Sequence, residues 1–190
     1  APLSDDLEIS KVSEFLEERR KDFGKIASDE VKKISLGRKY IRGLFSGGTL
    51  CDEVQIILKK DIENIFSNRA LDKQFALADS WISKGHTLVD LGEDEFTVGR
   101  LHPMMDFDLR NKRIFKEAKD KETAIILFDL VLGYGANEDP IKEILPIIKE
   151  AQIIAPDISF ICSVTGTKRD PQNRGKTIKS LEKNGIIVMP

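Results

Sequence analysis

The chain has 190 residues, a formal net charge of −2 and an isoelectric point near 5.8. Its 30 Lys and Arg residues are mixed with 32 Asp and Glu residues along the chain, so we expect no nucleic-acid partner. No stretch is long and apolar enough to span a bilayer, so no membrane partner is expected, and no secretory leader pattern is recognisable.

Residues 1–38 have the pattern of a helical extension or linker. Apolar residues recur at helical spacing between charged ones, which predicts an amphipathic helix or a pair of helices. Gly24 and the cap-like run 28–30 would separate the two helices of such a pair. We expect no catalysis in this segment. The chain begins with Ala1 rather than Met, which we interpret as processing or as a fragment of a longer protein.

Residues 39–190 alternate between apolar runs and amphipathic segments. Strands are predicted at 40–46, 87–91, 124–132, 159–164 and 186–189. Helices are predicted at 49–62, 71–81, 107–118, 140–155 and 172–184. Nearly continuous apolar strands are typical of a sheet that is covered on both faces. Right-handed crossovers then give an α/β, flavodoxin-like three-layer fold with a five-stranded parallel sheet.

Three of the predicted strands end in turns that combine glycine with polar residues. In a parallel sheet these turns lie along one edge, where ligands bind. Helix N-termini there present free N–H groups, so the expected ligand is an anion, and tight turns without a ligand are the alternative. The residues expected to bind the anion or substrate are Gly47, Gly48, Thr49, Gly133, Tyr134, Gly135, Thr165 and Gly166.

The first of these turns also contains a predicted helix cap and a cysteine. Thr49 is the predicted N-cap, and Asp52 would complete a capping box. Cys51 falls in the first helical turn, where the dipole would lower its thiol pKa; the alternative is a thiol packed against the sheet. Cys51 and Cys162 are too few for a disulfide framework, so a reducing, cytoplasmic location is expected. With two histidines in the chain, no metal site is expected.

The long polar loop 90–106 contains the predicted catalytic residues. Arg100 would hold an anion, His102 titrates near neutral pH, and Glu93 or Asp94 would orient one of them. The alternative is an internal salt-bridge network that folds the loop onto itself. Asp129, near the end of the third strand, either brings a further carboxylate to this edge or caps a neighbouring loop. His86 begins a strand at the opposite edge and is interpreted as structural.

Three strings of residues resemble a known family. They are GLFSGGTLC at 43–51, DLGEDEFTVGR at 90–100 followed by HPM at 102–104, and LVLGYGA at 130–136. Together they resemble the C-terminal, CoA-ligase-type domain of the FdrA family, over residue 40 to the end. More distantly, the order of elements is similar to the ligase domain of the succinyl-CoA synthetase β subunit.

The resemblance implies a ligase domain that works beside other domains or subunits of an acyl-CoA synthetase-like assembly. In such assemblies a Rossmann domain binds CoA and an ATP-grasp domain binds nucleotide, so CoA or nucleotide would be supplied through partner domains. It also implies acyl or carbamoyl group transfer and is compatible with a homo-oligomer. The chain lacks the family's Gly-His-Ala-Gly phosphohistidine loop, and Leu101 replaces an expected proline. We therefore expect it to be incomplete as an enzyme on its own.

Two functions remain open from the sequence. In the first, the chain is a domain of an FdrA-type protein, with a small anionic substrate or phosphate on the glycine-turn amides. Arg100 would then neutralise developing charge, and His102 would act as acid, base or phosphate carrier. In the second, the chain is a non-catalytic subunit that binds an anion or CoA-like ligand, or supports assembly.

Overall fold

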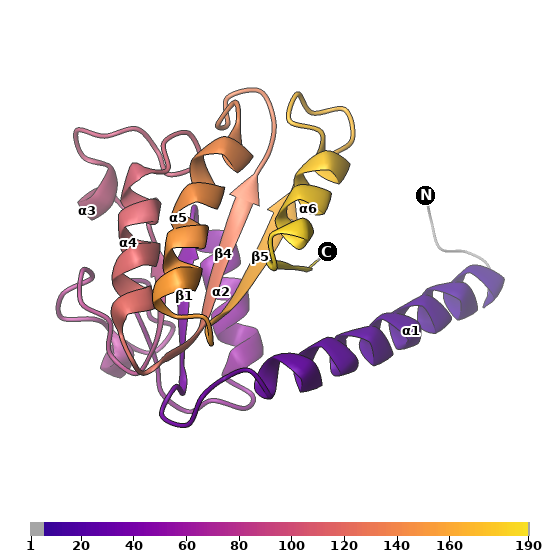
Figure 1. Ribbon diagram of the computed structural model, residues 1–190, viewed down its shortest axis with the longest axis horizontal. Helices are drawn as coiled ribbons and strands as arrows, with labels where there is room; N and C mark the ends of the chain where they lie inside the picture. Colours follow the sequence, from indigo (N-terminus) through magenta and orange to yellow (C-terminus); the bar gives the residue numbers. More distant parts are fainter. Residues whose placement is uncertain (1–5, 190) are drawn as a thin grey trace. The chain divides into compact units, whose positions relative to one another are not determined.

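The computed structural model describes residues 6–189, and contacts divide the chain into two units, residues 1–35 and 36–190. The first unit contains α1 (Asp6–Val31), one continuous helix of 26 residues (Figure 1). The helix-pair alternative is therefore wrong. Gly24 does not end the helix, and the Ser28 hydroxyl donates to its carbonyl oxygen at 2.8 Å from one turn further along.

The second unit contains a parallel sheet of six strands in the order β2-β3-β1-β4-β5-β6. Five of them, β3-β1-β4-β5-β6, have the flavodoxin-like order, which confirms the predicted fold class. The strands are β1 (Tyr40–Phe45), β2 (Ile65–Ser67), β3 (His86–Asp90), β4 (Thr123–Val131), β5 (Ser159–Thr165) and β6 (Ile187–Met189).

The sixth strand, β2, corrects the prediction of five. It has three residues, which pair with β3 at the edge of the sheet, so it leaves no long apolar pattern in the sequence. The helix predicted at 71–81 is also wrong, because this segment contains a short 3-10 turn at Lys73–Phe75. Asp72 and Asp79 each accept a hydrogen bond from a backbone N–H two residues later. Such local turns compete with a helix for the same backbone groups.

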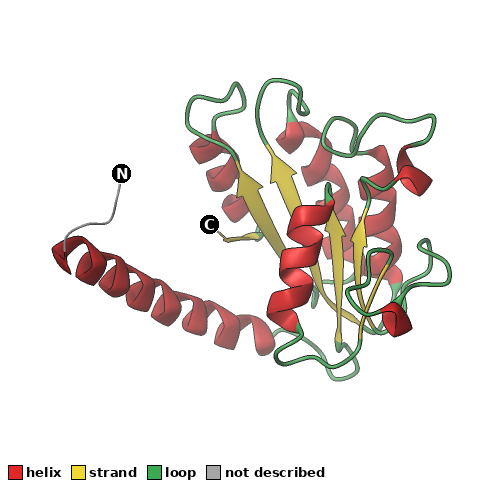
Figure 2. Cartoon of the chain, turned by 180° about the vertical axis from the view of Figure 1, so that it is seen from behind, coloured by secondary structure: helices red, strands yellow, loops and turns green. Residues whose placement is uncertain are grey.

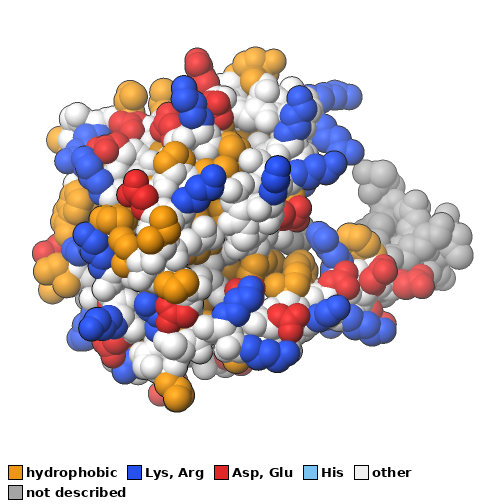
Figure 3. Space-filling model, viewed as in Figure 1, with side chains coloured by type: hydrophobic (Ala, Val, Ile, Leu, Met, Phe, Trp, Pro, Cys, Tyr) orange, Lys and Arg blue, Asp and Glu red, His pale blue; other side chains and the backbone are white. Residues whose placement is uncertain are grey.

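The remaining helices form the outer layers of the unit. They are α2 (Gly48–Leu58), α3 (Asp94–Thr97), α4 (Asp108–Lys119), α5 (Pro140–Ile154) and α6 (Arg174–Lys183). Helices α4, α5 and α6 lie on one face of the sheet, and α2 lies on the other (Figures 1 and 2). On the first face, charged side chains of both signs are interspersed over the surface (Figure 3).

Alternating side chains of β4 show how the sheet is buried. Ile126, Phe128 and Leu130 pack into a large apolar core with residues of α4 and α5. Leu127 points the other way and packs against a smaller cluster that includes α2 residues. Because side chains alternate along a strand with a period of two, neighbouring residues of β4 pack on opposite faces of the sheet.

No helix in residues 6–189 combines the length and the apolar composition that a membrane span requires.

A network of buried charges joins β1 to α4 at the amino ends of the strands. Arg42 pairs with Glu117 at 3.1 Å and with Asp120 at 2.7 Å. Glu117 pairs in addition with Arg113 at 2.6 Å, and Arg42, Arg113 and Glu117 are each 3 % exposed. His86 also lies at this edge, as expected for a structural residue, and accepts a hydrogen bond from the backbone N–H of Ile41.

Candidate functional site

A cleft of about 410 Å³ opens at the carboxyl ends of β1, β4 and β5. This is the topological switch point of the sheet, because β1 lies between β3 and β4 and helices on opposite faces lead to those neighbours. The polar lining residues are Ser46, Thr49, Glu53, His102, Asp129 and Thr165. The other lining residues are Gly47, Leu50, Met104 and Val131.

The N-terminus of α2 forms one wall of the cleft. Gly47 is the N-cap, in an extended conformation, with no side-chain cap. The amides of Gly48, Thr49 and Leu50 are in the first helical turn, where no intrahelical acceptor is available, and no other described residue accepts from them. The predicted N-cap at Thr49 and its capping box are wrong, since the helix begins directly after the extended Gly47 and Asp52 pairs with an arginine instead.

Asp129 of β4 forms the base of the cleft and is 3 % exposed. Its Oδ1 accepts hydrogen bonds from the Ser46 N–H at 2.7 Å and the Ser46 hydroxyl at 3.1 Å. Within residues 6–189, no protein group donates to Oδ2. Both sequence interpretations of Asp129 therefore apply, since it fixes the neighbouring turn and also brings a carboxylate to the cleft.

Arg110 of α4 lies behind this carboxylate and is fully buried. It donates to the Ser46 hydroxyl, to the Asp129 carbonyl oxygen and to the Pro103 carbonyl oxygen, and its guanidinium lies 3.7 Å from Asp129 Oδ1. Burial lowers the pKa of Arg110, and the nearby Asp129 opposes that effect. Arg110 thus locks the strand ends and the loop of His102 into one rigid base.

His102, from the loop 90–106, also lines the cleft. Its Nδ1 accepts a hydrogen bond from the Met104 N–H at 3.2 Å, so the neutral ring carries its proton on Nε2. A Cβ at Gly92 would lie 2.9 Å from His102 Nε2 and 2.8 Å from the Ser46 carbonyl oxygen. Glycine at 92 therefore allows the histidine to approach the first strand turn.

Arg69, which the sequence analysis missed, ties this loop to α2. Its guanidinium pairs with Glu93 at 2.6 Å and with Asp52 at 3.0 Å, and lies 3.8 Å from Asp90. Glu93 therefore forms no ion pair with Arg100 or His102. Its partner Arg69 lies outside the loop 90–106, so this pair is not part of a network internal to the loop. A single arginine after an unrecognised strand gave no signal in the sequence.

Arg100 lies outside the cleft. Its guanidinium is 6.0 Å from the centroid of the Trp81 ring, and the residue is exposed. It lines a small hollow of about 170 Å³ between Trp81, Phe96 and α4. The structure therefore brings His102 to the cleft and leaves Arg100 on a neighbouring surface.

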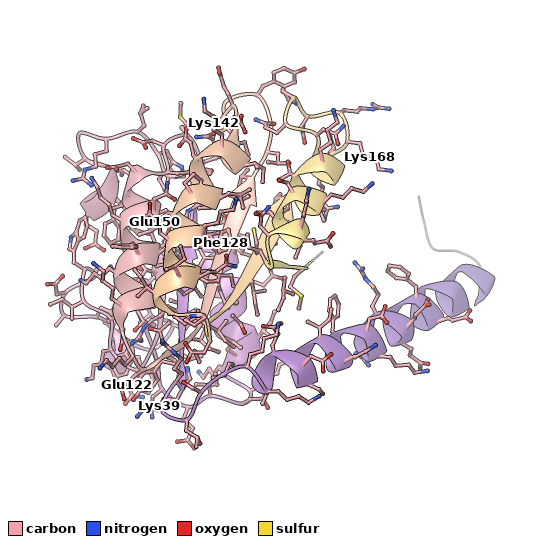
Figure 4. The ribbon with its side chains drawn as sticks, viewed as in Figure 1. Lys39, Glu122, Phe128, Lys142, Glu150 and Lys168 are labelled. Atoms are coloured by element: carbon pink, nitrogen blue, oxygen red, sulfur yellow. The ribbon has the colours of Figure 1, made fainter. Side chains whose placement is uncertain are left out.

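The glycine turn after β4 opens a separate hollow of about 950 Å³. Gly133, Tyr134 and Gly135 line it together with Lys142, and the two glycines have positive φ angles of 137° and 105°. Lys142 and Lys168 lie at the carboxyl edge of the sheet, and Lys39 and Glu122 lie at the opposite edge (Figure 4). The predicted glycine residues thus share an edge but divide between two hollows.

The two predicted residues of the turn after β5 have different roles. Thr165 lines the cleft, whereas Gly166 contacts neighbouring protein atoms. A Cβ at Gly166 would lie 2.8 Å from the Cβ of Leu132, and φ is 153°. The glycine is required there by packing and backbone conformation.

Comparison with known proteins gives the family of the chain. Residues 44–190 match the model of the CoA-ligase family, Ligase_CoA, which is more than half of the chain. The chain belongs to the CoA-ligase family. It is also 38 % identical over 167 residues to the uncharacterized protein YahF of Escherichia coli strain K12. That match covers 86 % of this chain and 32 % of YahF, so the chain spans about a third of the length of this relative.

The cleft of this CoA-ligase domain does not fit a complete CoA or nucleotide site. None of its lining residues is Lys or Arg, and Glu53 and Asp129 are acidic, so a pyrophosphate would meet no cationic side chain. One anionic group matches the three free amides of α2. In the part of the chain that the structure describes, no cluster of three or more His, Cys, Asp or Glu side chains is placed to hold a metal ion.

Both cysteines of the CoA-ligase domain are buried. Cys51 lies in the first turn of α2, but burial raises its thiol pKa to about 12, so the predicted lowering by the dipole is wrong and the packing alternative holds. Burial also raises the pKa of Cys162 well above its ordinary value. Neither thiol is a nucleophile at neutral pH.

Proposed function

We propose that the cleft binds a phosphate or carboxylate group on the N-terminus of α2 during acyl or carbamoyl group transfer. The observation that carries this proposal is the set of free amides at Gly48, Thr49 and Leu50 in the wall of a 410 Å³ cleft. Those N–H groups and the positive end of the helix dipole stabilise negative charge on a bound oxygen. Since no Lys or Arg lines the cleft, it suits one small transferred group better than a complete, multiply charged cofactor.

The chemistry of the cleft supports transfer as well as binding. Fixed amide donors stabilise charge that develops on the oxygens of the transferred group, because they are already oriented before reaction. His102 also lines the cleft, and its Nε2 would donate or accept the proton of the reacting group. Arg100 has no part in this proposal, because its side chain lies over Trp81.

The protein context of the proposal is an FdrA-type acyl-CoA synthetase-like assembly. Membership in the CoA-ligase family supports this context, and the three strings at 43–51, 90–104 and 130–136 favour the FdrA type. The cleft lacks cationic side chains, so CoA and nucleotide would bind to other domains or subunits. This chain would then supply the anion site and His102.

Removing one amide from the helix terminus tests the site. Thr49→Pro deletes the N–H at a position in the first turn where proline is tolerated, and the preceding Gly48 has no Cβ to clash with the ring. Thr49→Ala is the matched control, since it removes the hydroxyl and keeps the amide. We expect Thr49→Pro to weaken phosphate binding by about 10-fold or more, as for a hydrogen bond to a charged group.

Phosphate binding is measured by calorimetry and by shifts of the backbone amide resonances of residues 46–50. An absence of any response in the unmodified chain would reject the site. In the complete assembly, a His102→Ala variant that retains full activity would remove the proton-transfer role and leave the binding role.

One observation favours the second candidate, an assembly subunit without chemistry. Leu101 and Tyr134 are 60 % and 85 % exposed and line the same hollow of about 950 Å³. Apolar side chains that gather on one exposed surface are a feature of sites that bind another protein. A chain that ignores phosphate and small carboxylates, yet loses assembly when Tyr134 is changed to Ser, would establish this function instead.

A further inference from the structure

The cleft contains an acceptor that a simple anion site would not contain. Asp129 is almost fully buried, lines the cleft and keeps Oδ2 without a protein donor within the described residues. Ser46 and Arg110 hold Oδ1, which leaves Oδ2 as the free acceptor of this carboxylate. Oδ2 is not among the fully buried atoms that lack a partner, so it is accessible from the cleft, where a ligand that donates to it would form a charge-assisted hydrogen bond.

Donors surround this acceptor. The amides of the first turn of α2 begin two residues after Ser46, whose own N–H and hydroxyl bind Asp129. His102 also lines the cleft, and its Nε2 is a further donor. A ligand that satisfies the whole cleft must therefore accept hydrogen bonds through some atoms and donate at least one. Glu53 also lines the cleft, but it is exposed and remains solvated.

We propose that the cleft selects oxyanions that carry a hydrogen, and that Asp129 is the residue that determines this specificity. Hydrogen phosphate is the simplest such ligand, because it offers oxygens to the amides and an O–H to Asp129 Oδ2. Sulfate has the same shape but no hydrogen at neutral pH, so it would face the carboxylate with a lone pair. This inference rests on the proposed anion site and names the class of group that the site accepts.

The same chemistry extends to groups that carry N–H beside an anionic or carbonyl oxygen, such as a carbamoyl group. Sites built around a hydrogen bond to O–H or N–H reject analogues that lack the hydrogen, because the polar group of the protein is left unpaired. Repulsion between Asp129 and a second negative charge adds to this rejection, and the open mouth of the cleft reduces both effects through solvent.

Three anions of similar size test the proposal on the unmodified chain. Phosphate, sulfate and monofluorophosphate, which has no O–H at neutral pH, are titrated at equal ionic strength. We expect phosphate to bind about 100-fold more tightly than the other two. Equal affinities would overturn the inference while leaving the anion site intact. No response of the amides of residues 46–50 to any of the three would overturn the proposed function itself.

Substitution of the acceptor gives a second, independent test. Asp129→Asn replaces the carboxylate oxygen by a group that can donate, so sulfate should bind and the preference for phosphate should fall to within about 3-fold. Asp94→Asn is the matched control, since it makes the same change on an exposed residue outside the cleft. If Asp129→Asn keeps the preference, the inference is wrong. If that variant fails to fold, the comparison of the three anions still decides.

Discussion

Two buried arginine networks lie at opposite ends of the sheet, and they differ in one respect. At the amino ends, Arg42 and Arg113 share Glu117 and donate to further groups of the fold, although Arg42 Nε has no hydrogen-bond partner of its own. At the carboxyl ends, Arg110 and Ser46 hold Asp129 but leave its Oδ2 without a protein donor within the described residues. We call the first network closed because its charges pair with one another within the fold.

The second network is incomplete in the protein alone, because Asp129 Oδ2 has no protein donor within the described residues. This oxygen is not among the fully buried atoms that lack a partner, so it is accessible from the cleft. The two networks therefore differ in that one pairs its charges within the fold and the other keeps an acceptor that a ligand can reach.

The largest effect is expected from the closed network. Glu117→Gln leaves Arg42 and Arg113 buried without their shared counter-charge, which should lower the free energy of unfolding by about 3–5 kcal/mol. Urea denaturation measures the change, and phosphate affinity should stay the same. As a control, Glu122→Gln removes the exposed pair with Lys39 and should cost less than about 1 kcal/mol. Comparable losses in both variants would show that the amino-end network is not specially stabilising.

A smaller loss is expected from filling the gap beside His102. Gly92→Ala would place a Cβ 2.8 Å from the Ser46 carbonyl oxygen and 2.9 Å from His102 Nε2. The required shifts should cost about 1–3 kcal/mol and weaken phosphate binding. Gly24→Ala is the control, because no atom lies within 4 Å of its Cβ position and alanine is preferred to glycine inside a helix, so no loss is expected. Thermal unfolding of both proteins gives the comparison, and equal stability would contradict the close approach.

The buried thiol of Cys51 predicts that the free energy of unfolding depends on pH in alkaline solution. Its pKa is raised to about 12 in the folded protein, against an ordinary value of 9.0. Above pH 9 the unfolded chain therefore loses a proton that the folded chain keeps, so stability falls as pH rises. The loss approaches about 1.4 kcal/mol per pH unit between these two values.

Cys51→Ala should flatten this alkaline decline relative to the unmodified protein, as measured by urea denaturation from pH 8 to pH 11. Unchanged slopes would mean that Cys51 ionises equally in both states. The folded protein should also resist thiol-specific reagents at neutral pH, since Cys51 and Cys162 are fully buried.

The smallest effects on phosphate affinity are expected from His102 and Arg100, the two predicted catalytic residues of the loop 90–106 that remain to be compared. His102→Ala removes one donor from the cleft wall and should weaken phosphate binding by about 0.5–1.5 kcal/mol. Arg100→Ala should change the affinity by less than about 2-fold, because its side chain lies over Trp81. Calorimetric titration of both variants distinguishes them. A larger loss with Arg100→Ala would show that the arginine enters the cleft when ligand is bound.

The sequence contained the larger part of the fold. Apolar runs identified five strands, and helical periodicity located α4 and α5. These signals are strong because a strand that is covered on both faces must be apolar along its length. The short edge strand β2 lacked such a run, and local turns at Asp72 and Asp79 replaced the helix predicted at 71–81.

The site was only partly visible in the sequence. Arg110, Arg113 and Glu117 interrupt the buried side of α4 at helical spacing around Ile114. Charged residues at such positions are a sign of buried networks, and this signal was overlooked. That Arg100 turns toward Trp81 and that Glu93 pairs with Arg69 could not be predicted, because both depend on contacts across the fold.

By itself, the sequence determined a parallel α/β sheet and the edge at which its glycine turns gather, because both follow from local patterns and chain direction. Tertiary structure alone decided which polar groups share a cleft and which pair elsewhere. The physical reason is that hydrogen bonds and ion pairs depend on distances between residues far apart in the chain, as between Ser46, Arg110 and Asp129.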